Sequence, residues 1–254
     1  MREKKLHLKN VMKSFGGRKV VDIPELTLGT HGIEGLIGPN GAGKTTLINL
    51  ITHKLKMDCG QILYYTNGDG IDISKKPIDE IARLGMVRTN QIIQDFQSLT
   101  IRDSLLLSLA TPMYENFYNI FSERKLRKTV EQEIERYLDY FRFENPDGHA
   151  LSAGEKKLLD IIRCLVLKPK VLLMDEPTCG LPQDQIELFI ALMRKKTAEE
   201  GMTMLIVEHD LDLIWGVSEN VYFMAEGEIL IQGPPDEVRK NETVVTKYMG
   251  EGSA

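Results

Sequence analysis

The sequence lacks an apolar run long enough to cross a membrane. Its longest runs, such as residues 171–174 and 205–207, have the length of a strand, whereas a membrane-spanning helix needs roughly 20 apolar residues. No apolar core of a signal peptide follows the charged residues 1–5. We therefore expect a cytosolic protein, whose role at a membrane would depend on partner chains.

An excess of basic residues and paired cysteines are also lacking. Cys59, Cys164 and Cys179 lie far apart and form no CxxC pair, so the sequence predicts neither a disulfide framework nor a zinc site. Lysine and arginine number 32 against 37 aspartate and glutamate residues, which gives a net charge of −5 at pH 7. We expect no nucleic acid as the main partner of such a chain.

Apolar runs of strand length alternate with helical stretches in both terminal parts of the chain. The predicted strands are residues 33–37, 171–175 and 202–207, and the predicted helices are residues 43–52 and those that start from Asp184 and from Asp210. Strands that are apolar throughout and separated by helices indicate a parallel sheet covered on both faces.

The middle of the chain, from about Thr100 to Leu167, shows helical periodicity and almost no strand signal. Within it, residues 124–141 form a charged amphipathic stretch with one apolar side, which consists of Leu126, Val130, Ile134, Leu138 and Phe141. Short alternating strands in the N-terminal region and at residues 221–231 predict an antiparallel flank. The expected fold class is α/β, with a mixed sheet core, an antiparallel β flank and an inserted α-helical subdomain.

Residues 38–46, Gly-Pro-Asn-Gly-Ala-Gly-Lys-Thr-Thr, match the phosphate-loop pattern GxxxxGK[ST] between a predicted strand and a predicted helix. Glycines let the backbone fold round phosphates with its N–H groups inward, at a helix N-terminus that favours anions. Lys44 is expected to reach the β- and γ-phosphates, and the Thr45 hydroxyl to bind Mg²⁺. A glycine-rich turn that binds nothing would show this pattern by chance in on the order of one chain in a hundred. The loop residues expected to bind nucleotide are Asn40, Gly41, Ala42, Gly43, Lys44, Thr45 and Thr46.

Two carboxylates, Asp175 and Glu176, end the apolar strand at residues 171–175. A strand end beside a phosphate loop is where an α/β sheet forms its ligand crevice. Asp175 is expected to hold Mg²⁺ through water, and Glu176 to polarise the attacking water. The alternative is a solvated strand end with two ordinary acids.

Leu151-Ser152-Ala153-Gly154-Glu155 reads as a helix start with a capping box, because Ser152 suits the N-cap and Glu155 lies three residues on. The capping box accounts for these two residues without any function. It does not account for the place of this segment in the order of motifs along the chain.

That order carries a resemblance to a known family. The phosphate loop is followed by an isolated glutamine, Gln91, then by the Ser-x-Gly helix start, the acidic pair and, after the next strand, His209. The order resembles that of the ABC ATPase family, over nearly the whole chain. Residues 81–91, 207–210 and 227–250 are most similar to the ATPase subunits of importers for branched-chain amino acids or urea.

The resemblance implies a P-loop ABC-type ATPase domain that spans residues 1–254. About residues 1–90 and 168–254 would form the catalytic α/β core, and about residues 91–167 the helical subdomain that carries the signature motif. The implied ligands are ATP and Mg²⁺, and the implied activity is ATP hydrolysis coupled to transport.

The resemblance also implies roles for residues near the nucleotide. Phe15 corresponds to the aromatic that stacks on adenine, with Val20 beside it, although the sequence alone predicts an ordinary core or surface aromatic. Gln91 corresponds to the glutamine that senses Mg²⁺ and the attacking water. His209 corresponds to the histidine that contacts the γ-phosphate and orients Glu176.

Two further sets of residues take their roles from the resemblance. The implied metal site consists of Thr45, Gln91 and Asp175. The implied signature, which contacts the γ-phosphate of ATP held by the opposite subunit, consists of Ser152, Ala153, Gly154 and Glu155.

The partners follow from the resemblance as well. We expect a second ABC ATPase subunit, in a homodimer or a heterodimer, and transmembrane permease subunits docked near residues 96–102. A substrate-binding protein would act through the permease. The chain would lie on the cytoplasmic face of the cell membrane and power import of a small polar solute, such as an amino acid or urea, through ATP-driven dimer closure.

The sequence departs from the usual pattern of the family at three positions. Ala153 stands where the family usually has glycine, Glu155 where glutamine is common, and Pro182 where Asp or Asn is usual. Proline has no side-chain hydrogen bond to offer, so communication between the two nucleotide sites is hypothesised to be weaker or asymmetric.

Three alternative functions remain open from the sequence. They are the ATPase subunit of an exporter of lipid or polysaccharide, a soluble non-transport ABC protein and a binding-only subunit. Glu176 and His209 argue against the last of these.

Overall fold

The computed structural model describes residues 3–66, 68–89, 100–106, 120–143 and 151–249. For residues 120–127 and 249 it describes the backbone alone. The chain divides into two compact units. Unit 1 consists of Met1–Arg88, Lys170–Glu176 and Met193–Ala254, and unit 2 consists of Thr89–Pro169 and Pro177–Leu192.

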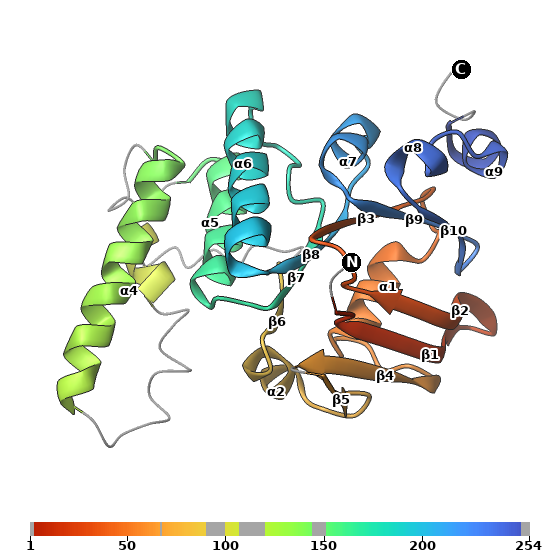
Figure 1. Ribbon diagram of the computed structural model, residues 1–254, viewed down its shortest axis with the longest axis horizontal. Helices are drawn as coiled ribbons and strands as arrows, with labels where there is room; N and C mark the ends of the chain where they lie inside the picture. Colours follow the sequence, from red (N-terminus) through yellow and green to blue (C-terminus); the bar gives the residue numbers. More distant parts are fainter. Residues whose placement is uncertain (1–2, 67, 90–99, 107–119, 144–150, 250–254) are drawn as a thin grey trace. The chain divides into compact units, whose positions relative to one another are not determined.

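A six-stranded sheet forms the centre of unit 1 (Figure 1). Its strands, in spatial order, are β10 (Glu228–Gly233), β9 (Asn220–Ala225), β3 (Ile33–Ile37), β8 (Thr203–Val207), β7 (Val171–Asp175) and β6 (Met86–Arg88). All neighbouring pairs are parallel except β9 and β10. Every residue of β3, β7 and β8 is buried, which confirms the strands predicted from continuous apolar runs.

The prediction of an antiparallel flank at residues 221–231 is wrong for the first half of that segment. β9 lies inside the six-stranded sheet, parallel to β3, and only β10 runs antiparallel at the edge. All six residues of β9 are buried, whereas burial alternates along β10. A strand with neighbours on both sides and with both faces covered needs a continuous apolar run. An edge strand with one face in water instead alternates apolar and polar residues.

A second, antiparallel sheet of unit 1 confirms the flank predicted for the N-terminal region. Its order is β2 (Arg18–Leu28), β1 (Leu6–Phe15), β4 (Cys59–Thr66) and β5 (Asp69–Asp72). One hydrophobic cluster joins this sheet, helix α1 (Lys44–Ile51) and the six-stranded sheet, and it includes Leu8, Ile23, Tyr64, Leu47, Leu50, Leu173 and Val207. The remaining helical elements of unit 1 are α2 (Ile78–Arg83), α7 (Leu211–Val217), α8 (Pro235–Val238), α9 (Glu242–Val244) and η1 (Val245–Met249). Burial of this cluster fixes α1 against both sheets.

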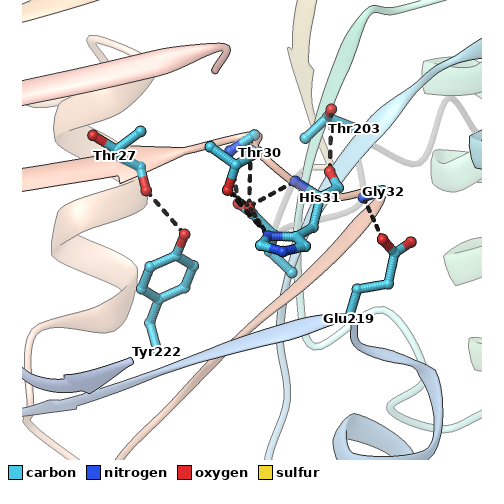
Figure 2. A network of polar contacts seen from close by, with 9 residues as sticks. Thr27, Thr30, His31, Gly32, Thr203, Glu219 and Tyr222 are labelled. Carbon is cyan, nitrogen blue, oxygen red and sulfur yellow. Dashed lines mark hydrogen bonds and ion pairs between the residues drawn. The ribbon is translucent and has the colours of Figure 1, made fainter. Parts of the chain in front are cut away.

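A polar network holds the connection between β2 and β3 in place (Figure 2). The Glu34 side chain is fully buried, and its carboxylate accepts the backbone N–H groups of residues 29, 30 and 31 at 2.8, 3.1 and 3.2 Å. The Tyr222 hydroxyl, on β9, donates to the Thr27 carbonyl at 2.9 Å. Burial raises the pKa of Glu34, and the N–H groups oppose that rise. The network anchors the start of β3, whose other end leads into residues 38–46.

Unit 2 is helical in its described residues. It contains α4 (Ile120–Tyr140), α5 (Ala153–Val166), the first part of α6 (Gln183–Glu200) and a helical segment at residues 101–106. On α4 and just after it, Ile134, Leu138 and Phe141 are buried and Val130 is half-buried, as the amphipathic pattern predicts; the Leu126 side chain lies outside the described residues. The Tyr140 hydroxyl donates to the Leu188 carbonyl of α6 at 3.0 Å. Within residues 100–106, 120–143 and 151–167 no strand occurs, which agrees with the helical periodicity.

Candidate functional site

The loop from Gly38 to Gly43 joins β3 to α1 and folds closely against neighbouring backbone. Gly38 has a φ of 151°, and a Cβ there would lie 1.9 Å from the Met224 carbonyl oxygen. Gly43 has a φ of 104°, and a Cβ there would lie 2.4 Å from the Val20 carbonyl oxygen. Both positions therefore require glycine for conformation and for space.

Helix α1 begins without a side-chain cap. Gly43 is its N-cap residue and has no side chain to accept the first N–H groups of the helix. These N–H groups carry the positive end of the helix dipole, which attracts anions. A cavity of about 230 Å³ opens at this helix start, lined by Val20, Asn40, Gly41, Ala42, Gly43, Lys44, Thr45, Thr46, Asp175, Glu176, Val207 and His209.

Lys44 brings a buried positive charge to this cavity. Its ammonium group donates hydrogen bonds to the Gly38 carbonyl and, at 3.0 Å, to the Pro39 carbonyl. Burial lowers the pKa of Lys44, while the nearby carboxylates of Asp175 and Glu176 oppose that fall. The loop thus places a cation beside a helix start that favours anions.

The acidic pair, Asp175 and Glu176, lines the same cavity. Asp175 is the last residue of β7 and is buried, whereas the Glu176 side chain is about 44% exposed. Glu176 has a φ of 50°, in the left-handed region that non-glycine residues rarely adopt. Its Oε1 lies 3.0 Å from Nε2 of His209, which follows β8. Backbone conformations of this kind cost about 1–3 kcal/mol and cluster at functional sites, so Glu176 is the first candidate for a chemical role.

The predicted helix start at Ser152 is a capping box, and it belongs to unit 2. The Ser152 hydroxyl oxygen accepts the Glu155 N–H at 3.2 Å, and the Glu155 carboxylate accepts the Ser152 N–H at 2.8 Å. A Cβ on Gly154 would lie 3.0 Å from the Gly180 carbonyl oxygen, so any other residue there would need the neighbouring backbone to shift slightly. These residues line a second cavity of about 540 Å³ together with Phe141, Arg142, Phe143, Leu158, Gly180, Leu181, Pro182 and Gln185.

A family model described as ABC transporter matches residues 21–179, which is more than half of the chain. The chain belongs to the ABC transporter family. The matched residues include the phosphate loop, the capping box at Ser152 and the acidic pair.

Curated relatives within the ABC transporter family match this chain over nearly its full length. A probable branched-chain amino acid transport ATP-binding protein LivG of Archaeoglobus fulgidus is 33% identical, over 96% of this chain and 95% of the relative. The high-affinity branched-chain amino acid transport ATP-binding protein LivG of Escherichia coli K12 is 31% identical, over 97% of this chain and 98% of the relative. The chain is thus homologous to ATP-binding subunits of this family.

Solved structures of ATP-binding cassettes share the fold. The ADP conformation of an ATP-binding cassette of an ABC transporter matches with a TM-score of 0.79 and 29% identity, over 98% of this chain and 99% of that one. A nucleotide-free cassette from an ABC transporter matches with a TM-score of 0.78 and 27% identity, over 97% of this chain and 99% of that one. The predicted α/β fold of an ABC-type ATPase is confirmed.

The structure gathers most of the predicted site residues of unit 1 around one cavity. Two predicted residues are exceptions. Phe15 does not line that cavity: it ends β1, is 49% exposed, and has the Lys13 ammonium 5.5 Å from its ring centroid. Gln91 lies outside the described residues, so its proposed role stays a prediction. Ser152, Ala153, Gly154 and Glu155 line the separate cavity of unit 2.

Two residues at the cavity or next to it, Val207 and Arg88, were not among the predicted site residues. Val207, the last residue of β8, lines the cavity. Arg88 forms an ion pair with Asp175, with Nη2 and Oδ2 3.3 Å apart, and donates a hydrogen bond to Asn49. The sequence gives no signal of its own for Arg88, because its place depends on the parallel pairing of β6 with β7, which brings the carboxyl ends of both strands to one edge of the sheet.

The residues present fit a bound Mg²⁺ ion. Thr45 and Asp175 offer a hydroxyl and a carboxylate oxygen to the same cavity. Mg²⁺ is usually bound by one or two protein oxygens together with water and substrate phosphates rather than by a protein cage. No group of three or more histidine, cysteine, aspartate or glutamate side chains gathers for a metal within the described part of the chain. None of the helices among those residues is long and apolar enough to cross a membrane.

Ser152→Ala is expected to lower the free energy of unfolding by about 1 kcal/mol, because alanine leaves the Glu155 N–H without its acceptor. Urea denaturation followed by circular dichroism measures this loss. The matched control is Glu155→Gln, which keeps an oxygen for the Ser152 N–H and is expected to cost at most about 0.5 kcal/mol. A Ser152→Ala variant as stable as the wild type would show that the capping box contributes nothing.

Proposed function

We propose that this chain is the ATP-hydrolysing subunit of an ABC importer for a small polar solute such as a branched-chain amino acid. The class of solute rests on the relatives, whose names describe branched-chain amino acid transport. Hydrolysis rests on one observation above the others: Lys44, Asp175, Glu176 and His209 all line one cavity at the start of α1.

Each of these residues has a proposed role in the chemistry. The phosphates of ATP lie at the uncapped start of α1, where Lys44 contacts the β- and γ-phosphates. Mg²⁺, held by Thr45 and Asp175, would supply positive charge to the phosphate oxygens. Gln91 is proposed to complete that metal site, and Phe15 with Val20 to hold the adenine.

Glu176 is the proposed general base. Its half-exposed carboxylate accepts a proton from a water molecule as the water oxygen attacks the γ-phosphorus. The bond between that phosphorus and the bridging oxygen breaks, which yields ADP and inorganic phosphate. His209, 3.0 Å from Glu176, holds the carboxylate in place and contacts the γ-phosphate.

The working unit is proposed to be a dimer of ATPase subunits. Ser152 and Gly154 line the cavity of unit 2 and not the one that holds Lys44. We assign them, with Ala153 and Glu155, to the ATP of the opposite subunit, which a helix start can clamp. Contacts to the γ-phosphate from both subunits exist only before hydrolysis, so hydrolysis opens the dimer.

The chain also has a proposed place in the transporter. We propose that residues 1–254 form one ATPase domain, whose helical part docks on a permease at the cytoplasmic face of the membrane. A substrate-binding protein would act through that permease. Choice of the transported molecule belongs to those partners.

The rate of ATP hydrolysis by the purified wild-type chain tests the proposal. We expect phosphate release in MgATP and no release above background in EDTA. We also expect the specific rate to rise with protein concentration, because two subunits must meet. Tight MgATP binding without any phosphate release, at concentrations where the chain dimerises, would contradict hydrolysis and favour a binding-only subunit.

A further inference from the structure

Arg88 connects three elements around the proposed metal end of the nucleotide cavity. It ends β6, which pairs in parallel with β7, with Arg88 opposite Leu173. Its Nη2 lies 3.3 Å from Oδ2 of Asp175, at the end of β7. Its Nη1 donates a hydrogen bond to Oδ1 of Asn49, on the helix that begins with Lys44. The guanidinium therefore ties the buried carboxylate to α1.

The Arg88–Asp175 pair is almost closed to water. The Arg88 side chain is 8% exposed and the Asp175 side chain 2%. In such surroundings charges are weakly screened, and a carboxylate without a counter-charge is strongly unfavourable. Arginine keeps its charge in proteins and holds carboxylates with a rigid fork of N–H groups. Arg88 thus supplies a permanent positive charge directly behind one wall of the cavity.

The positive charge of Arg88 matters because the cavity is lined by side chains of both positive and negative charge. Asp175 and Glu176 line the same space in which Lys44 and the α1 start would attract phosphates. The triphosphate of ATP carries up to four negative charges and would meet both carboxylates there. A divalent cation compensates this repulsion when it is present. Without one, the compensation must come from the protein.

We propose that Arg88 is a positioning residue that acts as the built-in counter-charge of Asp175 and lets the triphosphate enter the cavity before Mg²⁺ is in place. The proposal rests on the proposed function, because it assumes that ATP occupies this cavity. It also makes a prediction that a purely structural role does not make. Loss of Arg88 weakens binding of metal-free ATP more than binding of MgATP.

The test is a double-mutant cycle on the full chain, with the Kd of ATP measured by calorimetry in EDTA and in Mg²⁺. Arg88→Met removes the positive charge and is expected to raise the Kd in EDTA about tenfold and the Kd in Mg²⁺ by about threefold or less. Asp175→Asn, with Arg88 intact, is expected to lower the Kd in EDTA about tenfold. The double variant is expected to return to within about threefold of the wild type in EDTA. Arg88→Lys keeps the positive charge, so its Kd in EDTA should also lie within about threefold of the wild-type value.

The two single variants are expected to change the Kd in EDTA in opposite directions. Asp175→Asn therefore tests the proposal even if Arg88→Met does not fold. Circular dichroism and the Tm establish folding for each variant before binding is measured. An unchanged or raised Kd for Asp175→Asn in EDTA would overturn the counter-charge role. Equal weakening of Arg88→Met in EDTA and in Mg²⁺ would also overturn it and leave Arg88 a structural residue. A wild-type chain that binds no ATP in either buffer would refute the proposed function instead.

Discussion

Lys44→Ala is expected to raise the Kd for MgATP about a hundredfold. Lys44 is the cation of the cavity at the α1 start, and its proposed hydrogen bonds to two phosphates are charge-assisted. Each such bond contributes about 1.5–3 kcal/mol, so the loss of both costs at least about 3 kcal/mol, and this lower bound corresponds to about two orders of magnitude in Kd. Isothermal titration calorimetry on the purified chain measures the change.

The fold itself should tolerate this substitution. Alanine is a strong helix former, and Lys44 is the first residue of α1. The ammonium donates to carbonyls of its own loop, and burial lowers the pKa of Lys44. When its charge is removed, Asp175 in β7 still has Arg88 as a counter-ion. Lys54→Ala is the matched control, because Lys54 is an exposed lysine just beyond α1 and does not line the cavity. If Lys54→Ala weakened ATP binding as much as Lys44→Ala, the loss would reflect net charge and the phosphate contact would be refuted.

Glu176→Gln is expected to lower kcat for ATP hydrolysis about a thousandfold while the Kd for MgATP changes by less than about threefold. General-base catalysis contributes on the order of 10²- to 10⁴-fold, and glutamine has no basic oxygen to take the proton. Glutamine has the same shape and still offers a hydrogen bond toward His209, 3.0 Å away in the wild type. Single-turnover phosphate release measures the chemical step, and calorimetry measures binding.

The same variant should accumulate as an ATP-bound dimer. Because hydrolysis is what removes the γ-phosphate contacts, a chain that binds ATP without cleaving it stays closed. Size-exclusion chromatography with light scattering should show a dimer in MgATP and a monomer in MgADP. Glu226→Gln, at an exposed acid elsewhere in unit 1, is the matched control and should hydrolyse ATP at the wild-type rate. Wild-type turnover by Glu176→Gln would assign the general base to another residue.

Local patterns predicted the parts of the site that depend on neighbours in sequence. The phosphate loop needs glycine at Gly38 and Gly43, and the pattern of residue types records that need, although the Met224 and Val20 carbonyls that enforce it were not visible. The capping box at Ser152 is local in the same way, and the structure confirms both of its hydrogen bonds. The capping box is set by contacts within a few residues, so its sequence pattern suffices to predict it.

Features that depend on tertiary contacts were missed or misplaced. The pattern of residues 221–231 predicts one antiparallel flank, whereas the burial of β9 depends on its parallel neighbour β3. No local pattern marks Arg88, because the pairing of β6 with β7 is what places it beside Asp175. The left-handed conformation of Glu176 likewise has no sequence signal.

The central claim, that this chain powers a transporter, is tested most directly by what it holds in the membrane. Tagged Glu176→Gln, loaded with MgATP, is captured from detergent-solubilised native membranes, and the proteins that come with it are identified by mass spectrometry. We expect a polytopic permease, either alone or with a second ATPase subunit, and capture of that permease should be lost with Lys44→Ala, which does not bind ATP tightly. Recovery of ribosomes or DNA-repair factors, with no membrane protein bound by a chain shown to bind ATP, would contradict the account.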